Sequence, residues 1–382
     1  MKKGFVWILI LACLLAGCGG KTEEVIATQP VQTAPPTEPV TTQPVTEPQD
    51  PVDALLASMS LEEKVGQLFF ARCPEGKGAE DAAQYHLGGY ILFARDFASR
   101  SAEEVLADVQ SYQAASQIPV LIGVDEEGGK VVRASSQFIL RDTPFLSPQQ
   151  LFAEGGMDRI LADTKEKDDF LAAMGVNVNF APVADISVDP QDFIYERTLG
   201  QDAKTTADYV SQVLAQMAED NMGSSLKHFP GYGPNVDTHG AIAVDERPLE
   251  TFQASDLLPF KTHAAGQGKT SIMVSHNIVN CLDDQMPASL SPKVHDFLRQ
   301  ELGFAGVVMP DALDMEAVAE YAQDGDIAVT ALLAGNDMLL VCDYESGIPA
   351  ILRAVTDGVI PESRIEEACR RVLTWKQALG LI

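Results

Sequence analysis

The sequence predicts an α/β protein whose folded part is a single (β/α)8 barrel of the TIM type. From about Val52 onward, short apolar runs rich in Val, Ile and Leu alternate with segments of helical periodicity. Polar residues recur where these runs end, as they do at the carboxyl ends of barrel strands. An open, doubly wound sheet is the alternative. Because no glycine-rich dinucleotide fingerprint or Walker loop follows a predicted strand, its nucleotide-binding forms are disfavoured.

The predicted elements follow one another along the chain as strand and helix. Seven strands are predicted, at residues 89–93, 120–125, 176–181, 224–228, 272–276, 307–311 and 338–341. Ser60 and Ser101 are each followed three residues later by Glu, a capping box that opens a helix. Amphipathic segments at 203–220, 292–301 and 361–379 predict further helices.

Composition limits the class of protein. Hydrophobic residues make up 46% of the 382 residues and charged residues 21%, which supports a large core and excludes general disorder. Lys and Arg total 27 against 55 Asp and Glu, a net charge of −28. A polyanion is repelled by such a field, so we expect no nucleic-acid partner. The six cysteines are too few for a disulfide scaffold.

Four cysteines belong to the predicted barrel, and none forms a CxxC pair. They are Cys73, Cys281, Cys342 and Cys369. We expect buried free thiols and no metal cluster.

The amino-terminal segment carries an export signal. Lys2 and Lys3 precede an apolar run from Phe5 to Leu15 that is too short to cross a bilayer comfortably. The run ends in Leu-Ala-Gly-Cys, which resembles the lipobox of bacterial lipoproteins and implies cleavage before Cys18 and lipidation of its sulfur. We therefore expect an extracytoplasmic protein anchored to the bacterial cell membrane through lipid at Cys18. An ordinary secretory signal with an incidental cysteine is the alternative.

A linker separates the signal from the barrel. Its composition is rich in Thr and Pro, and Thr-Gln-Pro-Val occurs at Thr28 and again at Thr42. Such a stretch cannot bury a core and indicates a disordered tether. The predicted organisation is a signal peptide at 1–17, a linker at 18–51 and a catalytic barrel at 52–382.

The strand ends suggest one pocket. Titratable or cationic residues follow five of the predicted strands: Asp125, Asp185, Lys227 with His228, His276, and Asp311. Because functional groups of a barrel gather at the carboxyl ends of its strands, we expect a shared pocket lined from several sides. In the loop that follows Lys227, Asp237 precedes His239 by two residues and can accept its N–H, which makes a general acid/base. A capped turn with both side chains in solvent explains the same pair equally well.

The loop sequence Lys-His-Phe-Pro-Gly-Tyr-Gly…Asp-Thr-His, residues 227–239, resembles glycoside hydrolase family 3, specifically its β-N-acetylhexosaminidase branch. Four other segments agree in the same order: 123–133, 179–186 with 196–200, 272–276 and 306–315. The resemblance covers essentially residues 52–382. It implies Asp311 as the nucleophile, and His239, oriented by Asp237, as the acid/base. The sugar-binding residues that it implies are Asp125, Arg133, Arg197, Lys227 and His228.

The resemblance therefore implies a retaining exo-β-N-acetylhexosaminidase that needs no cofactor or metal. It would release terminal β-linked N-acetylglucosamine from oligosaccharides such as cell-wall fragments during peptidoglycan turnover, and we expect a monomer. The chain departs from the family at Tyr232, where His is common, at Pro310, where Ser or Thr is common, and at Lys130, where Arg is frequent.

Four alternatives remain open from the sequence. Two belong to the same family, a β-glucosidase and a phosphorylase. The third is a lipoprotein that binds sugar without catalysis, which the changes at Tyr232 and Pro310 motivate. The fourth is a metal-dependent barrel hydrolase. Its candidate ligands are His228, His239, His276, Asp125 and Asp311.

Overall fold

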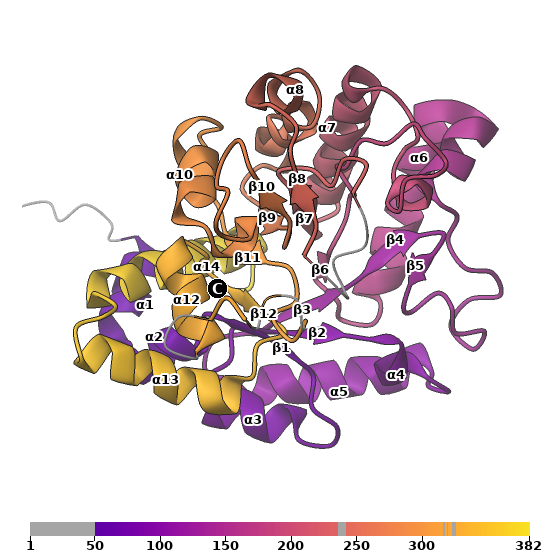
Figure 1. Ribbon diagram of the computed structural model, residues 1–382. Helices are drawn as coiled ribbons and strands as arrows, with labels where there is room; N and C mark the ends of the chain where they lie inside the picture. Colours follow the sequence, from indigo (N-terminus) through magenta and orange to yellow (C-terminus); the bar gives the residue numbers. More distant parts are fainter. Residues whose placement is uncertain (1–49, 236–241, 316–317, 319, 323–325) are drawn as a thin grey trace, which may run out of the picture. The chain divides into compact units, whose positions relative to one another are not determined.

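The computed structural model describes residues 50–382, apart from 236–241, 316–317, 319 and 323–325 (Figure 1). Its centre is one sheet of eight strands, all parallel to their neighbours. The strands are β1 (Phe69–Arg72), β2 (Gly89–Leu92), β3 (Leu121–Val124), β6 (Val178–Asn179), β7 (Gly223–Phe229), β9 (Thr270–Val274), β11 (Val308–Pro310) and β12 (Leu339–Leu340). They follow one another around the sheet in chain order, and β12 lies beside β1.

Backbone hydrogen bonds close the sheet into a cylinder between β11 and β12. The amides of Asp337 and Met338 donate to the Val308 carbonyl at 2.7 and 3.2 Å, and Leu313 N donates to Leu340 O at 3.0 Å. The predicted (β/α)8 barrel is thus confirmed, and the open doubly wound sheet is wrong. In an open sheet the two edge strands stay apart, whereas here they bond to each other.

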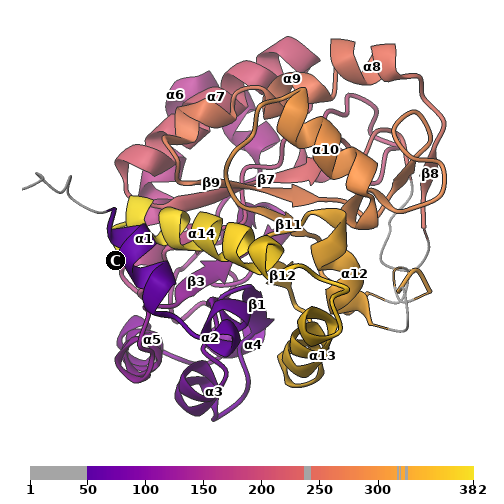
Figure 2. The same ribbon diagram turned by 90° about the vertical axis from the view of Figure 1, so that its left-hand side faces the viewer.

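Helices follow the strands and surround the sheet (Figure 2). They are α3 (Gly78–Gln84), α4 (Ala94–Phe97), α5 (Ala102–Ala115), α6 (Pro148–Ala172), α7 (Ala203–Glu219), α8 (Leu249–Ala254), α9 (Leu257–Phe260), α10 (Pro292–Gln300), α12 (Ile327–Ala334) and α13 (Tyr344–Thr356). Short 3₁₀ turns lie at Tyr195–Arg197, His263–Gly266 and Ala288–Leu290. Connections at the carboxyl ends of the strands carry two small sheets, β4 (Glu126–Gly128) with β5 (Val131–Val132), and β8 (Val244–Asp245) with β10 (Ile278–Val279).

The last helix, α14 (Glu362–Ala378), closes the amino end of the barrel. Lys376 bonds to Gln67 just before β1, and Trp375 Nε1 donates to the Lys269 carbonyl just before β9. The same helix packs on α1 (Pro51–Ser58) and α2 (Leu61–Gly66), which precede the first strand. Figure 2 shows α14 crossing in front of the strands. The carboxyl end of the barrel lies opposite this helix.

The structure contains all seven predicted strands, with ends that differ by a few residues, and adds β1. The sequence analysis missed β1 because its apolar residues come directly after α2 and continue a helical run. Both predicted capping boxes are confirmed: Ser60 Oγ accepts from Glu63 N at 3.2 Å, and Ser101 Oγ accepts from Glu104 N at 3.3 Å.

Free cysteines are found at the four barrel positions, as predicted, and three of them are buried while Cys281 is partly exposed. Among the residues that the structure describes, no helix is both long enough and apolar enough to cross a membrane. The predicted signal peptide and the linker up to residue 49 lie outside those residues, as does Cys18.

Candidate active site

A pocket of about 710 Å³ lies at the carboxyl ends of the strands. The structure brings six of the predicted site residues together in its lining: Asp125, Arg133, Arg197, Lys227, His228 and Asp311. They come from β3, β7, β11 and two long connections, which is the convergence that the strand ends predicted. Asp237 and His239 lie outside the residues that the structure describes.

Lys227 is the central cation of the pocket. Its side chain is only 2% exposed, and Nζ lies 2.7 Å from Asp125 Oδ1 and 2.6 Å from Glu127 Oε1. Burial alone lowers the pKa of a lysine, but the two carboxylates outweigh burial and raise the pKa of Lys227 above its ordinary value. The ammonium group is therefore permanently charged and holds both carboxylates in place.

Glu127 links Lys227 to Arg197, and the sequence analysis did not single it out. Arg197 donates to both oxygens of Glu127, with Nη2–Oε1 at 2.7 Å and Nε–Oε2 at 3.0 Å. Burial raises the pKa of Glu127, but Arg197 and Lys227 more than reverse this and hold it well below its usual value. The sequence contains one signal for Glu127, its distance from Asp125. The two are two residues apart, and residues two apart on extended backbone point to the same face.

His228 is fixed by partners on both ring nitrogens. Nδ1 lies 2.7 Å from Asp185 Oδ2, and Nε2 lies 3.2 Å from Arg197 Nη2. Because a guanidinium only donates, Nε2 must accept, so the proton is on Nδ1 and points to Asp185. The other Asp185 oxygen accepts from the Tyr232 amide at 2.7 Å. Asp185 therefore supports the imidazole from behind and does not line the pocket.

Asp311 follows β11 and is held at the floor of the pocket by its own backbone. Its amide donates to Val274 O at 2.8 Å, and Ala312 N donates to Asp311 Oδ1 at 2.8 Å. Burial raises the pKa of this carboxyl, but His228, His276, the Ala312 amide and Lys227 together bring it below its ordinary value. An ionised carboxylate that lines the pocket, with one oxygen held by a backbone amide, is suited to act as a nucleophile.

Pro310 is accommodated because of its place in the strand. Asp311 N points to β9, so the nitrogen of Pro310 points the opposite way, to the seam between β11 and β12. The missing N–H therefore costs no ladder bond between β9 and β11.

His276 lies behind the pocket and does not line it, contrary to the expectation for this strand end. Its side chain is fully buried, with Nδ1 2.7 Å from Ser289 Oγ and Nε2 3.0 Å from the Ala312 carbonyl. It thereby holds the residue whose amide holds Asp311. Within the described ranges, no three His, Cys, Asp or Glu side chains are grouped to hold a metal ion.

Arg133 enters the pocket from the connection that follows β5. The buried carboxylate of Glu126 shapes this connection, because Oε2 accepts from the amides of Arg133 and Ala134 at 2.9 and 2.8 Å. The Arg133 guanidinium lies 5.9 Å from the centre of the Phe93 ring, and Arg72 lies 4.4 Å from it. Phe93 thus lines the pocket and lies within cation–π distance of two arginines.

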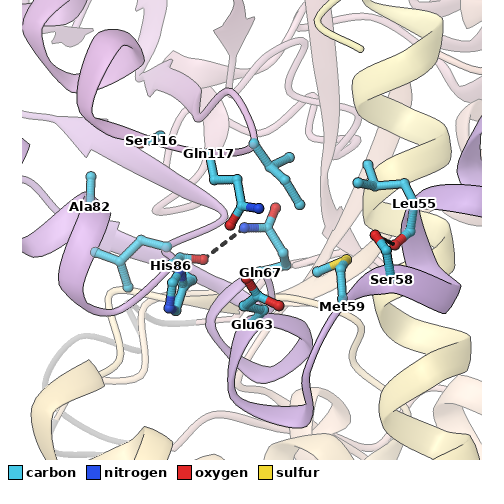
Figure 3. A pocket seen from close by; sticks show the side chains of 11 residues that line it. Leu55, Ser58, Met59, Glu63, Gln67, Ala82, His86, Ser116 and Gln117 are labelled. Atoms are coloured by element: carbon cyan, nitrogen blue, oxygen red, sulfur yellow. Dashed lines mark hydrogen bonds between the residues drawn. The ribbon is translucent and has the colours of Figure 1, made fainter.

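A second cavity, of about 370 Å³, lies at the amino end of the barrel (Figure 3). Gln67 Nε2 donates to the His86 carbonyl there at 2.7 Å. Glu63 and His86 are its ionisable lining residues, and the rest are apolar or neutral. It lacks the opposed charges of the carboxyl-end pocket, which is therefore the candidate active site.

Comparison with known proteins identifies the family. The model of the glycosyl hydrolase family 3 N-terminal domain matches residues 60–375. A protein of Idiomarina loihiensis named beta-hexosaminidase is 34% identical over 303 residues, 77% of this chain and 88% of that protein. One of Alkalilimnicola ehrlichii with the same name is 33% identical over 279 residues, 71% of this chain and 78% of that protein.

A solved structure shows the same fold. It is a glycoside hydrolase family 3 β-N-acetylglucosaminidase from Paenibacillus, with a TM-score of 0.78 and 30% identity over 85% of this chain. This chain spans 63% of that longer protein. With the family model matched along most of the barrel and the charged pocket at its carboxyl end, the chain belongs to glycoside hydrolase family 3 and is a glycosidase.

Proposed function

We propose that the enzyme is a retaining exo-β-N-acetylhexosaminidase that removes terminal β-linked N-acetylglucosamine from glycans. The observation that carries the proposal is the Asp311 carboxylate, whose pKa is lowered on a pocket floor lined by a fixed charge network. Family members named beta-hexosaminidase, at 33–34% identity, support the choice of sugar.

The sugar is proposed to bind to charged and hydrogen-bonding groups whose positions are fixed before it enters the pocket. Asp125, Arg133, Arg197, Lys227 and His228 would bind the hydroxyl and acetamido groups of the terminal residue. Because most of them are fixed by each other, little side-chain freedom is lost on binding. The sugar is thereby positioned with its anomeric carbon above Asp311.

The proposed reaction has two steps. Asp311 attacks the anomeric carbon while the bond to the leaving oxygen breaks, and His239 gives that oxygen a proton. Water then attacks the same carbon, His239 takes its proton, and the bond to Asp311 breaks. Two inversions give retention of configuration. Asp237 is proposed to accept the other N–H of His239 and so orient it.

Replacement of Asp311 tests this proposal. Asp311→Asn keeps the shape of the side chain but removes the nucleophile, so hydrolysis of an aryl β-N-acetylglucosaminide should fall at least about 1,000-fold. A 2-fluoro sugar with a good leaving group should label Asp311 covalently, as peptide mass spectrometry would show. Asp314→Asn is the matched control, because Asp314 lies three residues further on, half exposed and paired with Arg72. Full activity of Asp311→Asn, or a label on another residue, rules the mechanism out.

We also propose that the enzyme is a monomer held by lipid at Cys18 on the outer side of the bacterial cell membrane, where it processes peptidoglycan fragments. The basic start, the short apolar run and the cysteine support this proposal. Cys18→Ala should move the protein from the membrane fraction to the soluble extracytoplasmic fraction, as immunoblotting would show. A variant that stays with the membrane would contradict lipid anchoring at this residue.

A further inference from the structure

Phe193 is a large apolar side chain that the fold keeps in contact with solvent. It is 40% exposed, whereas the next residue, Ile194, is fully buried. Its ring lies against Tyr232, with the centroids 5.9 Å apart and the planes inclined at 43°. Tyr232 in turn lines the active-site pocket and meets the His228 ring at 5.3 Å. Phe193 itself is outside the pocket lining and is next to it through its contact with Tyr232.

The connection that carries Phe193 is braced internally. Ser187 Oγ donates to Asp192 Oδ2 at 2.7 Å, and the Asp192 amide donates to Asp189 O at 3.0 Å. Further along, Thr198 Oγ1 donates to the Tyr195 carbonyl at 2.9 Å and lies 3.4 Å from the Ser187 carbonyl. The exposed ring is thus held on a stiff loop and does not result from a loose one.

Both ends of this connection are tied to the pocket. Asp185, before it, holds His228, and Arg197, at its far end, holds Glu127. The position of Phe193 is therefore fixed relative to the proposed sugar-binding groups. A preorganised apolar surface beside a polar pocket is typical of a ligand contact.

The connection that carries Phe193 also carries a charged group. Glu196, on the same connection, forms an ion pair with Lys130 of the turn between β4 and β5, and both side chains are more than half exposed. Val188, 63% exposed, adds a second apolar group to the connection. An exposed aromatic ring on a connection that also carries a charged group suits a pyranose ring, which presents C–H bonds on its face and hydroxyls at its edge.

We infer that Phe193 forms the binding site for the sugar unit on the leaving-group side of the cleaved bond. The inference rests on the proposed function, in which the pocket holds the terminal N-acetylglucosamine. The next sugar of the glycan then projects from the mouth and stacks on the Phe193 ring. Binding energy at this position favours oligosaccharides over glycosides with small leaving groups.

Two substrates with different leaving groups test the inference. In Phe193→Ala, kcat/KM for N,N′-diacetylchitobiose should fall roughly tenfold, mainly through KM, because the stacking surface is lost. For methyl β-N-acetylglucosaminide, which has no second ring, kcat/KM should stay within about twofold of the wild-type value. Phe193→Trp restores a flat ring and should keep the preference for the disaccharide.

Controls separate this site from general effects. Phe138→Ala removes another exposed phenylalanine, 79% accessible, and should leave both substrates unchanged. An equal loss on both substrates in Phe193→Ala, or no loss on the disaccharide, overturns the inference. If the wild-type enzyme cleaves neither substrate, the proposed function itself fails, which is a separate result.

Discussion

Glu127 shows how a residue without a proposed bond to the substrate sets the geometry of the site. It lies between Arg197 and Lys227, is 2% exposed in its side chain, and accepts hydrogen bonds from both cations. Removing its charge leaves two buried cations with one carboxylate, Asp125, close to Lys227. Breaking a buried ion pair from one side costs several times more than an exposed pair contributes.

Glu127→Gln should therefore reduce kcat/KM for an aryl β-N-acetylglucosaminide by about 100-fold, since Lys227 and Arg197 are no longer held in register. Steady-state kinetics measure this effect, and a thermal melt shows whether the variant still folds. Glu219→Gln, at the exposed end of α7, is the control and should retain full activity. Wild-type kinetics in Glu127→Gln would mean that the network does not position the site.

At the same scale, sequence patterns predicted which residues gather in the pocket but not how they pair. Lys227 and Asp125 were recognisable because each follows a predicted strand. Glu127 meets Arg197 across 70 residues of chain, and no local pattern states that pairing. His276 was expected in the pocket because it ends a strand, yet its ring turns toward Ser289 and Ala312. Side-chain direction at a strand end depends on the connection that follows, which the sequence analysis did not resolve.

At the scale of elements, apolar runs predicted seven of the eight strands. They did not predict the contacts that join β11 to β12. Asp337, fully buried, receives ion pairs there from Arg299 at 2.5 Å and Arg371 at 2.9 Å, and accepts from Val308 N at 3.0 Å. These arginines come from α10 and α14. One carboxylate thus ties two helices to the strand that carries Asp311. These ion pairs join residues from separate parts of the chain, so the periodicity of apolar residues within one segment cannot predict them.

At the scale of the whole molecule, the acidity of the chain and the charge of the pocket differ. The chain carries a net charge of −28. The pocket lining combines Asp125, Glu127 and Asp311 with Arg133, Arg197 and Lys227, so its acids and bases balance, with His228 in addition. A balanced pocket suits an uncharged sugar, while the surrounding negative field disfavours polyanions. The sequence analysis expects no nucleic-acid partner from the total charge alone, and this stays a prediction.

The buried end of α14 makes the stability of the molecule depend on pH. Lys376 is fully buried at the amino end of the barrel, and its Nζ donates to Gln67 Oε1 at 2.6 Å. Burial lowers the pKa of Lys376 to about 7. In the unfolded chain the ordinary value is about 10.4, so between the two values the unfolded state binds a proton that the folded state lacks.

The free energy of unfolding should therefore rise with pH from about 7 to about 10, by up to about 1.4 kcal/mol per pH unit from this group, and level off below pH 7. Lys376→Met removes the group. In urea denaturation, the free energy of unfolding of the variant should exceed that of wild type most at or below pH 7, and the difference should shrink as pH rises. Lys261→Met, at an exposed lysine, should instead follow the wild-type pH dependence. If the free energy of unfolding instead has the same pH dependence in wild type and in Lys376→Met, the buried amine stays charged in the folded protein. The burial of Lys376 then does not make stability depend on pH.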